Sequence, residues 1–185
     1  MAGDIPVPGS VRGRLVEAAQ FLFERDGYEA TSVTDVAAKA SVTTGALYHH
    51  FGSKLGLYVA LRSDLDKRLT DRIAGAAESN GGSGADAVRA ALLVAFDAAV
   101  RFGVPRIVGE APPVAGPDME QDVIEAALES VVRPDLPVAA RLLTAAWRAA
   151  LLTVADGEPV DHARAALQSL TPRPVDLRLD VGGDD

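Results

Sequence analysis

The sequence predicts an all-α fold, with a small helical unit at the N-terminus followed by a larger helical region. Apolar residues recur at spacings of three and four along almost the whole chain, as they do on the buried face of a helix. No stretch alternates between apolar and polar residues as a half-buried strand would. Hydroxyl and carboxylate residues precede several of the periodic segments, and Gly or Pro follows them.

Three helices are predicted in the N-terminal unit, of which the second and third are short. The second begins at the capping box formed by Ser32 and Asp35, and the third is capped by Thr43 or Thr44. Gly27 ends the first helix, whose inward face is formed by Leu15, Ala18, Ala19, Leu22 and Phe23.

Longer helices are predicted after this unit. Ser53 caps a long fourth helix with an apolar residue at every fourth position, and a loop rich in Gly and Ser follows at 79–84. Further helices are expected over 85–102, 119–132, 138–155 and 160–170, with Gly103, Pro105 and later prolines between them. The predicted organisation is a helix-turn-helix domain at 1–52, with a flexible arm at 1–9, a helical domain at 53–171, and a disordered tail at 172–185.

Composition limits the classes of function. The net charge of −8 argues against indiscriminate binding to nucleic acid, although a local face without carboxylates can still meet phosphates. Cysteine is absent, which excludes disulfides, thiolate metal sites and a cysteine nucleophile. No signal peptide or membrane-spanning segment is apparent, so we expect a cytoplasmic protein.

Residues 43–54, TTGALYHHFGSK, lack any carboxylate in this acidic chain. They follow a short turn after the second predicted helix, which makes a helix-turn-helix unit whose second helix enters the DNA major groove. If Leu47 and Phe51 pack inward, the outward positions are Thr44, Gly45, Tyr48 and His49. A carboxylate on that face would repel the DNA backbone, which explains the composition of the segment.

Each outward residue has an expected role on DNA. Thr44 and His49 are placed for base edges, Tyr48 and Lys54 for phosphates, and Gly45 allows close approach. An alternative for Tyr48 is a half-buried packing role. The full predicted DNA-contact set is Ser32, Thr34, Thr43, Thr44, Gly45, Tyr48, His49 and Lys54.

The segment from 14 to 54 resembles the DNA-binding module of TetR-family transcriptional repressors. The resemblance rests chiefly on Gly27-Tyr28, Thr31-Ser32-Val33, Asp35-Val36-Ala37, Thr44-Gly45, Leu47-Tyr48, His50-Phe51 and Ser53-Lys54. It implies a homodimer formed by the last two long helices, a small-molecule effector pocket in the C-terminal domain, and release from a palindromic double-stranded DNA operator when the effector binds. Two positions depart from the family pattern: Ser41 replaces the usual Gly of the turn, and Leu55-Gly56 replaces the Glu that often follows the Lys.

The resemblance directs attention to C-terminal residues that could line an effector cavity, since such pockets combine apolar walls with a few polar groups. For each of them, ordinary core packing or surface exposure is the alternative. The candidates are Phe96, Phe102, Arg106, Met119 and Trp147.

Two other functions are weighed beside a ligand-responsive repressor. One is a DNA-binding regulator of the same module without a small-molecule effector. The other is an α-helical enzyme, for which the sequence offers no paired metal-ligand motif, no phosphate loop and no nucleophile with its base. His49 and His50 point about 100° apart on a helix and do not form a metal site. We therefore expect no catalytic residues, no cofactor and no metal.

Overall fold

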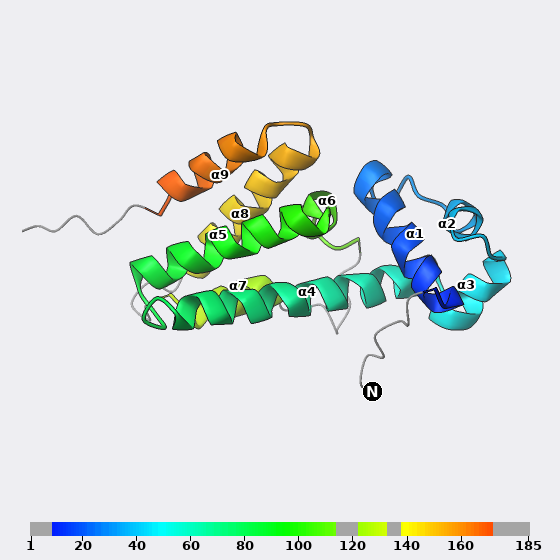
Figure 1. Ribbon diagram of the computed structural model, residues 1–185, viewed down its shortest axis with the longest axis horizontal. Coiled ribbons are helices and arrows are strands. Elements are labelled where there is room, and N and C mark those ends of the chain that lie inside the picture. Colours follow the sequence, from blue (N-terminus) through cyan, green and yellow to red (C-terminus); the bar gives the residue numbers. More distant parts are fainter. Residues whose placement is uncertain (1–8, 114–121, 133–137, 172–185) are drawn as a thin grey trace, which may run out of the picture.

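The computed structural model describes residues 9–113, 122–132 and 138–171, and its regular structure there is entirely helical. The predicted all-α fold is therefore confirmed. In chain order, the described helices are α1 (Val11–Asp26), α2 (Val33–Lys39), α3 (Thr44–Phe51), α4 (Lys54–Glu78), α5 (Ala85–Phe102), α6 (Pro105–Gly109), α7 (Val123–Glu129), α8 (Ala139–Ala155) and α9 (Val160–Ser169) (Figure 1).

Side-chain caps fix where the N-terminal helices begin. Ser32 and Asp35 form the predicted capping box of α2, with the Ser32 hydroxyl accepting from the Asp35 amide and the Asp35 carboxylate accepting from the Ser32 amide. Thr43 is the cap of α3, and Ser53 is the cap of α4. Gly27 ends α1 as predicted; its φ of 81° is positive, but its ψ of 166° lies outside the left-handed helical region expected of a C′ glycine.

The two positions that depart from the family pattern have distinct structural consequences. Ser41 lies in the turn between α2 and α3 with a φ of 54°, which confirms that it takes the strained conformation usually left to Gly. Gly56 lies in the first turn of α4, where a Cβ would collide with the carbonyl oxygen of Phe51. Gly56 therefore allows the tight connection between α3 and α4.

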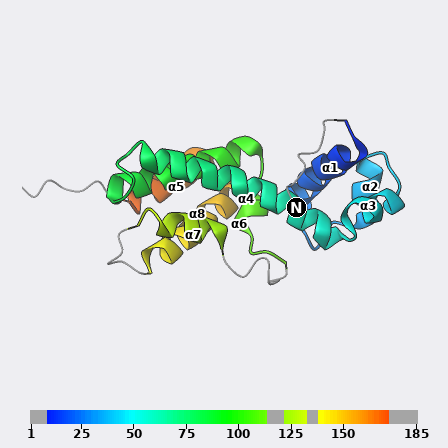
Figure 2. The same cartoon turned by 90° about the horizontal axis from the view of Figure 1, so that it is seen from below.

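The molecule is elongated, with α1, α2 and α3 gathered at one end and α4 running from them along the remaining helices (Figures 1 and 2). Beyond the N-terminal unit, α4 packs on α5, α5 on α8, α8 on α7 and α7 on α4, while α9 covers α5 and α8. The short helix α6 contacts both α1 and α8. None of the helices in the described ranges is long and apolar enough to cross a membrane.

Two parts of the predicted helix layout need correction. The helix expected over 119–132 has described bounds of Val123–Glu129, and positions 119–121 lie outside the described residues. Helix α6 was not predicted at all, because five residues are too few to show a helical period. The predicted arm, except Gly9, and the predicted tail at 172–185 also lie outside the described residues.

Candidate nucleic-acid interface

Helix α3 is anchored to the N-terminal unit by its apolar side. Leu47 is fully buried, and Phe51 packs against the same core with the Arg12 guanidinium 5.2 Å from the centre of its ring. The hydroxyl of Thr43 accepts a hydrogen bond from the amide of Ala46 at 3.3 Å, which fixes the first turn. These contacts determine which side of α3 faces outward.

The outward face of α3 carries the residues that the sequence placed there. Thr44, Gly45, Tyr48 and His49 are all exposed, and 54% of Tyr48 remains accessible. A Cβ on Gly45 would make only an ordinary contact with the Thr43 hydroxyl, so packing within the chain does not require Gly there. The missing side chain instead leaves room for a surface from outside the protein.

The hydroxyls assigned to phosphate contact on α2 differ in availability. The Ser32 hydroxyl donates to the Asp35 carboxylate at 2.6 Å and accepts from the Asp35 amide at 3.1 Å. Its proton is therefore engaged within the capping box. Thr34 is exposed in the first turn of α2.

Lys54 has structural contacts that the sequence did not indicate. Its Nζ donates to the carbonyl oxygens of Tyr28 at 2.9 Å and Thr31 at 3.0 Å, and lies 4.1 Å from the centre of the Tyr28 ring. An ammonium has three N–H donors, so two of them hold the α1–α2 loop against α4. The phosphate role of Lys54 stays a prediction, and it would depend on the remaining donor.

Arg14 is a further basic residue with a structural contact that the sequence pattern does not indicate. Its Nε donates to the carbonyl oxygen of Ala40 at 3.1 Å, which ties α1 to the end of α2 beside the strained turn at Ser41. A sequence-distant contact to a backbone carbonyl leaves no local pattern, so no spacing rule could have identified it.

Helix α6 joins the N-terminal unit to the rest of the molecule through its two ends. The Glu24 carboxylate of α1 accepts from the amides of Arg106 at 2.9 Å and Ile107 at 3.0 Å. Arg62 of α4 is buried and donates to the carbonyl oxygens of Ile107 at 2.8 Å and Glu110 at 3.4 Å. A negative charge at the start of a helix and a positive charge at its end both interact favourably with the helix dipole and stabilise the helix.

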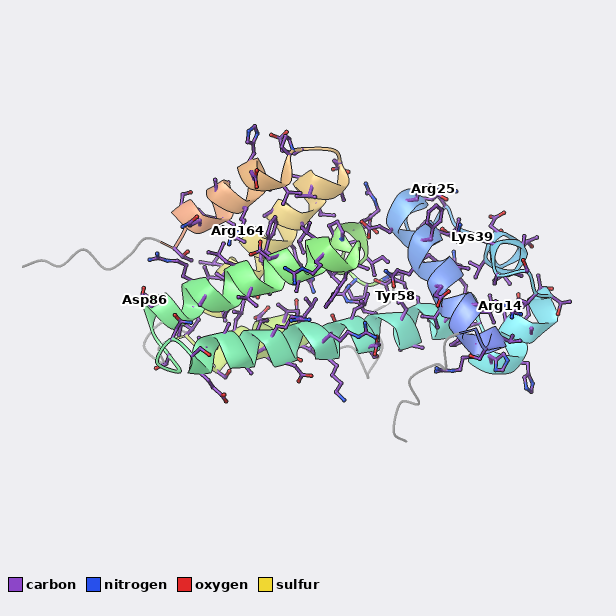
Figure 3. All side chains as sticks on the ribbon, viewed as in Figure 1. Arg14, Arg25, Lys39, Tyr58, Asp86 and Arg164 are labelled. Carbon is purple, nitrogen blue, oxygen red and sulfur yellow. The ribbon has the colours of Figure 1, made fainter. Side chains whose placement is uncertain are left out.

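Burial dominates the electrostatics of Glu24. Desolvation raises the pKa of its carboxyl above the usual value, and the two backbone hydrogen bonds and Arg106 only partly counteract it. Tyr58 projects from α4 into the same junction (Figure 3), and burial likewise raises the pKa of its hydroxyl. The junction is therefore poorly solvated, which strengthens the hydrogen bonds within it.

The predicted effector residues do not share one described cleft. Phe96 and Trp147 are fully buried, and Phe102 is half-buried beneath the Arg72 guanidinium. Arg106 is engaged with Glu110, Asp156 and the carbonyl oxygen of Ala155, and Met119 lies outside the described residues.

One described cleft, of about 300 Å³, lies where α1 meets the segment after α6, and it contains none of the five predicted effector residues. Its lining is Asp26, Gly27, Tyr28, Glu29, Ala30, Tyr58, Glu110, Ala111 and Pro113.

Comparison with known proteins gives the N-terminal unit a family context. Residues 15–61 match the sequence model described as bacterial regulatory proteins of the tetR family. Over 55 residues, the chain is 46% identical to the HTH-type transcriptional repressor KstR2 of Mycolicibacterium smegmatis, a match that covers 29% of this chain and 27% of KstR2. The chain matches about a quarter of the length of such curated relatives.

Solved structures extend the likeness over most of the chain. A TetR-like transcriptional regulator from Rhodococcus sp. RHA1 has a TM-score of 0.63 and 27% identity, covering 90% of this chain and 96% of its own. A putative tetR family transcription regulator from Shewanella sp. PV-4 has a TM-score of 0.65 and 22% identity, covering 88% and 96%. The second likeness bears on the fold alone.

Proposed function

Because the chain belongs to the TetR family of bacterial transcriptional regulators, we propose that it is a repressor that binds a palindromic operator as a homodimer and responds to a small-molecule effector. The observation that carries the DNA-binding part is the exposed, carboxylate-free face of α3, with Tyr48 protruding beside the bare backbone of Gly45. Repression is proposed because KstR2, which shares the DNA-binding segment, is named a repressor.

In the proposed complex, α3 of each protomer enters the major groove of one half-site. Thr44 and His49 would contact base edges, while Tyr48 and the free donor of Lys54 would contact phosphates. Two such helices bind half-sites about one helical turn apart, so a dimer of fixed spacing selects a palindrome.

The proposed dimer uses the outer surface of α8 and α9. Val138, just before α8, and Leu142, one turn on, are 62% and 66% exposed, and Leu170 after α9 is 57% exposed. Apolar side chains gathered on one surface gain free energy when a second copy covers them. The predicted bundle of the last two long helices would supply that cover.

The effector response would reach α3 through two connections. Helix α4 runs from the N-terminal unit through the C-terminal helices, and α6 connects α1 to the end of α8. A ligand that favours one arrangement of α6 and α8 would shift the orientation of α1 and therefore the separation of the two α3 helices.

Selection of bound sequences from random duplex DNA tests the DNA-binding proposal. We expect an inverted repeat whose half-site centres are about one helical turn apart. Tyr48→Ala should weaken binding to the selected duplex while leaving the helical circular dichroism unchanged. Phe21→Ala, which removes another exposed aromatic of the N-terminal unit outside α3, is the matched control.

Enrichment of no sequence, or equal binding by the wild type and Tyr48→Ala, would refute the assignment of α3. Sedimentation of the free protein as a monomer at the concentrations that bind DNA would refute the homodimer. Screening compounds for loss of operator binding separates the effector-responsive repressor from a regulator without an effector.

A further inference from the structure

Four C-terminal helices enclose a common interior. α4 packs on α5, α5 on α8, α8 on α7, and α7 on α4, which closes a ring. Most of the ring's inward residues are apolar and fully buried, including Leu69, Leu92, Ile124, Leu128 and Leu151. Polar groups in such a place need partners, because burying them without hydrogen bonds is costly.

Helix α8 contributes buried polar atoms without such partners. Trp147 is fully buried and Thr144 is 3% exposed, yet neither the indole Nε1 nor the hydroxyl has a hydrogen-bond partner among the described residues. Arg148 binds Asp122 through Nη2 at 2.8 Å, while its Nε has no partner in the described chain. The spacing of these residues keeps them within one turn of α8.

Arg89 adds a buried positive charge from α5, which packs against α8. Its side chain is 13% exposed, and its Nε and Nη2 are buried without hydrogen-bond partners in the described ranges. The carboxylate of Asp86 approaches it only to 3.8 Å and is itself 65% exposed, at the end of α5 remote from α1 (Figure 3). Within the described part of the chain, this desolvated guanidinium has no closer counter-charge than the Asp86 carboxylate.

Two other internal arginines in the described ranges, Arg62 and Arg148, are paired with carboxylates. Arg62 binds Asp66 at 2.9 Å, and Arg148 binds Asp122, so these two carboxylates are already neutralised. The unpartnered atoms of Arg89, Trp147 and Arg148 are donors only, and the Thr144 hydroxyl can also donate. Among the described residues, the interior therefore lacks a group that accepts hydrogen bonds from these donors and carries negative charge.

We propose that the interior of the α4–α5–α8–α7 ring binds an effector with an apolar body and an anionic oxygen head, a carboxylate or a phosphate. Arg89 supplies the counter-charge, and Thr144, Trp147 and the Nε of Arg148 supply hydrogen bonds. This inference rests on the proposed effector response and adds the chemical class of the ligand. The donors lie on α5 and α8. Because α8 packs against α6, a ligand bound there would influence the junction between α6 and α1.

Trp147 is the sole tryptophan of the chain, so its fluorescence reports directly on this interior. Octanoate and octyl phosphate serve as anionic probes, with octan-1-ol and octylamine as neutral and cationic probes of the same chain length. We expect both or one of the anionic probes to change the Trp147 emission saturably, and the other two to have no saturable effect. Which anionic probe binds more tightly distinguishes the two head groups.

Variants test the assignment of Arg89. Arg89→Met should weaken binding of the anionic probe by at least about tenfold, since it removes a charge-assisted contact. Arg101→Met, an exposed arginine on the same helix, should keep wild-type affinity. Without probe, the melting temperature of Arg89→Met should be no lower than that of the wild type, because the substitution removes a poorly paired buried charge. If Arg89 served only to stabilise the fold, the substitution would lower the melting temperature.

Thr144→Val keeps the side-chain shape but removes the hydroxyl, so it should also weaken binding of the anionic probe. This variant provides the second test if Arg89→Met does not fold. The proposal is overturned by equal binding of octan-1-ol or octylamine, by no response to either anionic probe, or by wild-type affinity in Arg89→Met. Operator binding is measured separately on the selected duplex. An anionic probe that binds without releasing DNA contradicts the proposed effector response and leaves the binding site intact, whereas operator binding without any probe response contradicts the site alone.

Discussion

Replacing Lys54 with methionine removes the ammonium that joins the α1–α2 loop to α4, while keeping most of the side-chain volume. The lost interactions are hydrogen bonds to the carbonyl oxygens of Tyr28 at 2.9 Å and Thr31 at 3.0 Å, and the contact with the Tyr28 ring at 4.1 Å. Both carbonyls would then need water or would lack a partner.

The expected cost follows from these contacts. Hydrogen bonds from a charged group contribute roughly 1.5–3 kcal/mol each, and a partly exposed cation–π contact contributes about 0.5–1 kcal/mol. The site is only partly buried, so water replaces some of what is lost. The lower ends of these ranges add to about 3.5 kcal/mol, and water reduces that loss, so we expect the free energy of unfolding to fall by about 2–3 kcal/mol.

Urea denaturation followed by circular dichroism measures this change. Lys67→Met is the matched control, since Lys67 is exposed on the same helix. If Lys54→Met unfolds at the same urea concentration as Lys67→Met, the structural role of the ammonium is refuted. The salt dependence of operator binding tests the phosphate role separately: loss of one phosphate contact lowers the slope of log affinity against log salt by about 0.9, and an unchanged slope would contradict that contact.

Three further outcomes can be measured by denaturation. Ser41→Gly should raise the free energy of unfolding by about 0.5–1 kcal/mol, because it relieves the positive φ; a decrease would contradict strain at the turn. Gly56→Ala should lower it by about 1–3 kcal/mol despite the better helix propensity of Ala, because its Cβ meets the carbonyl oxygen of Phe51; a gain would refute that clash. Glu24 holds its proton more tightly when folded, so its contribution favours folding at low pH and is lost as the pH rises above 4.5 through its folded pKa. Glu24→Gln should therefore lose less stability than the wild type between about pH 4 and about pH 7, and parallel pH profiles would exclude this linkage.

Local chemistry explains which features the sequence could predict. Capping residues act within three or four positions, so the starts of α2, α3 and α4 could be placed from Ser32, Thr43 or Thr44, and Ser53. The exposed face of α3 followed from the positions of Leu47 and Phe51, because a helix with two inward residues has a defined outer side. DNA contact by that face remains a prediction.

Features that depend on contacts between distant segments could not be predicted from local sequence patterns. Helix α6 depends on Glu24 and Arg62, which lie more than forty positions earlier in the chain. The two carbonyl contacts of Lys54 are similarly invisible in a linear pattern, so its side chain was assigned to DNA alone. Among the predicted effector residues, spacing could not separate Phe96, which is fully buried in the core, from Trp147, whose indole nitrogen lacks a partner.

A helix as short as α6 cannot persist in water unaided, because too few turns follow the costly first one. Its helical form therefore depends on tertiary contacts: α1 binds its start, α4 binds its end, and α8 packs against it. Deuterium uptake at the amides of Val108 and Gly109 would consequently report whether α6 still contacts both the N-terminal unit and the C-terminal helices. A compound or duplex that weakens one of these contacts should increase deuterium uptake in α6 before it increases uptake in the long helices.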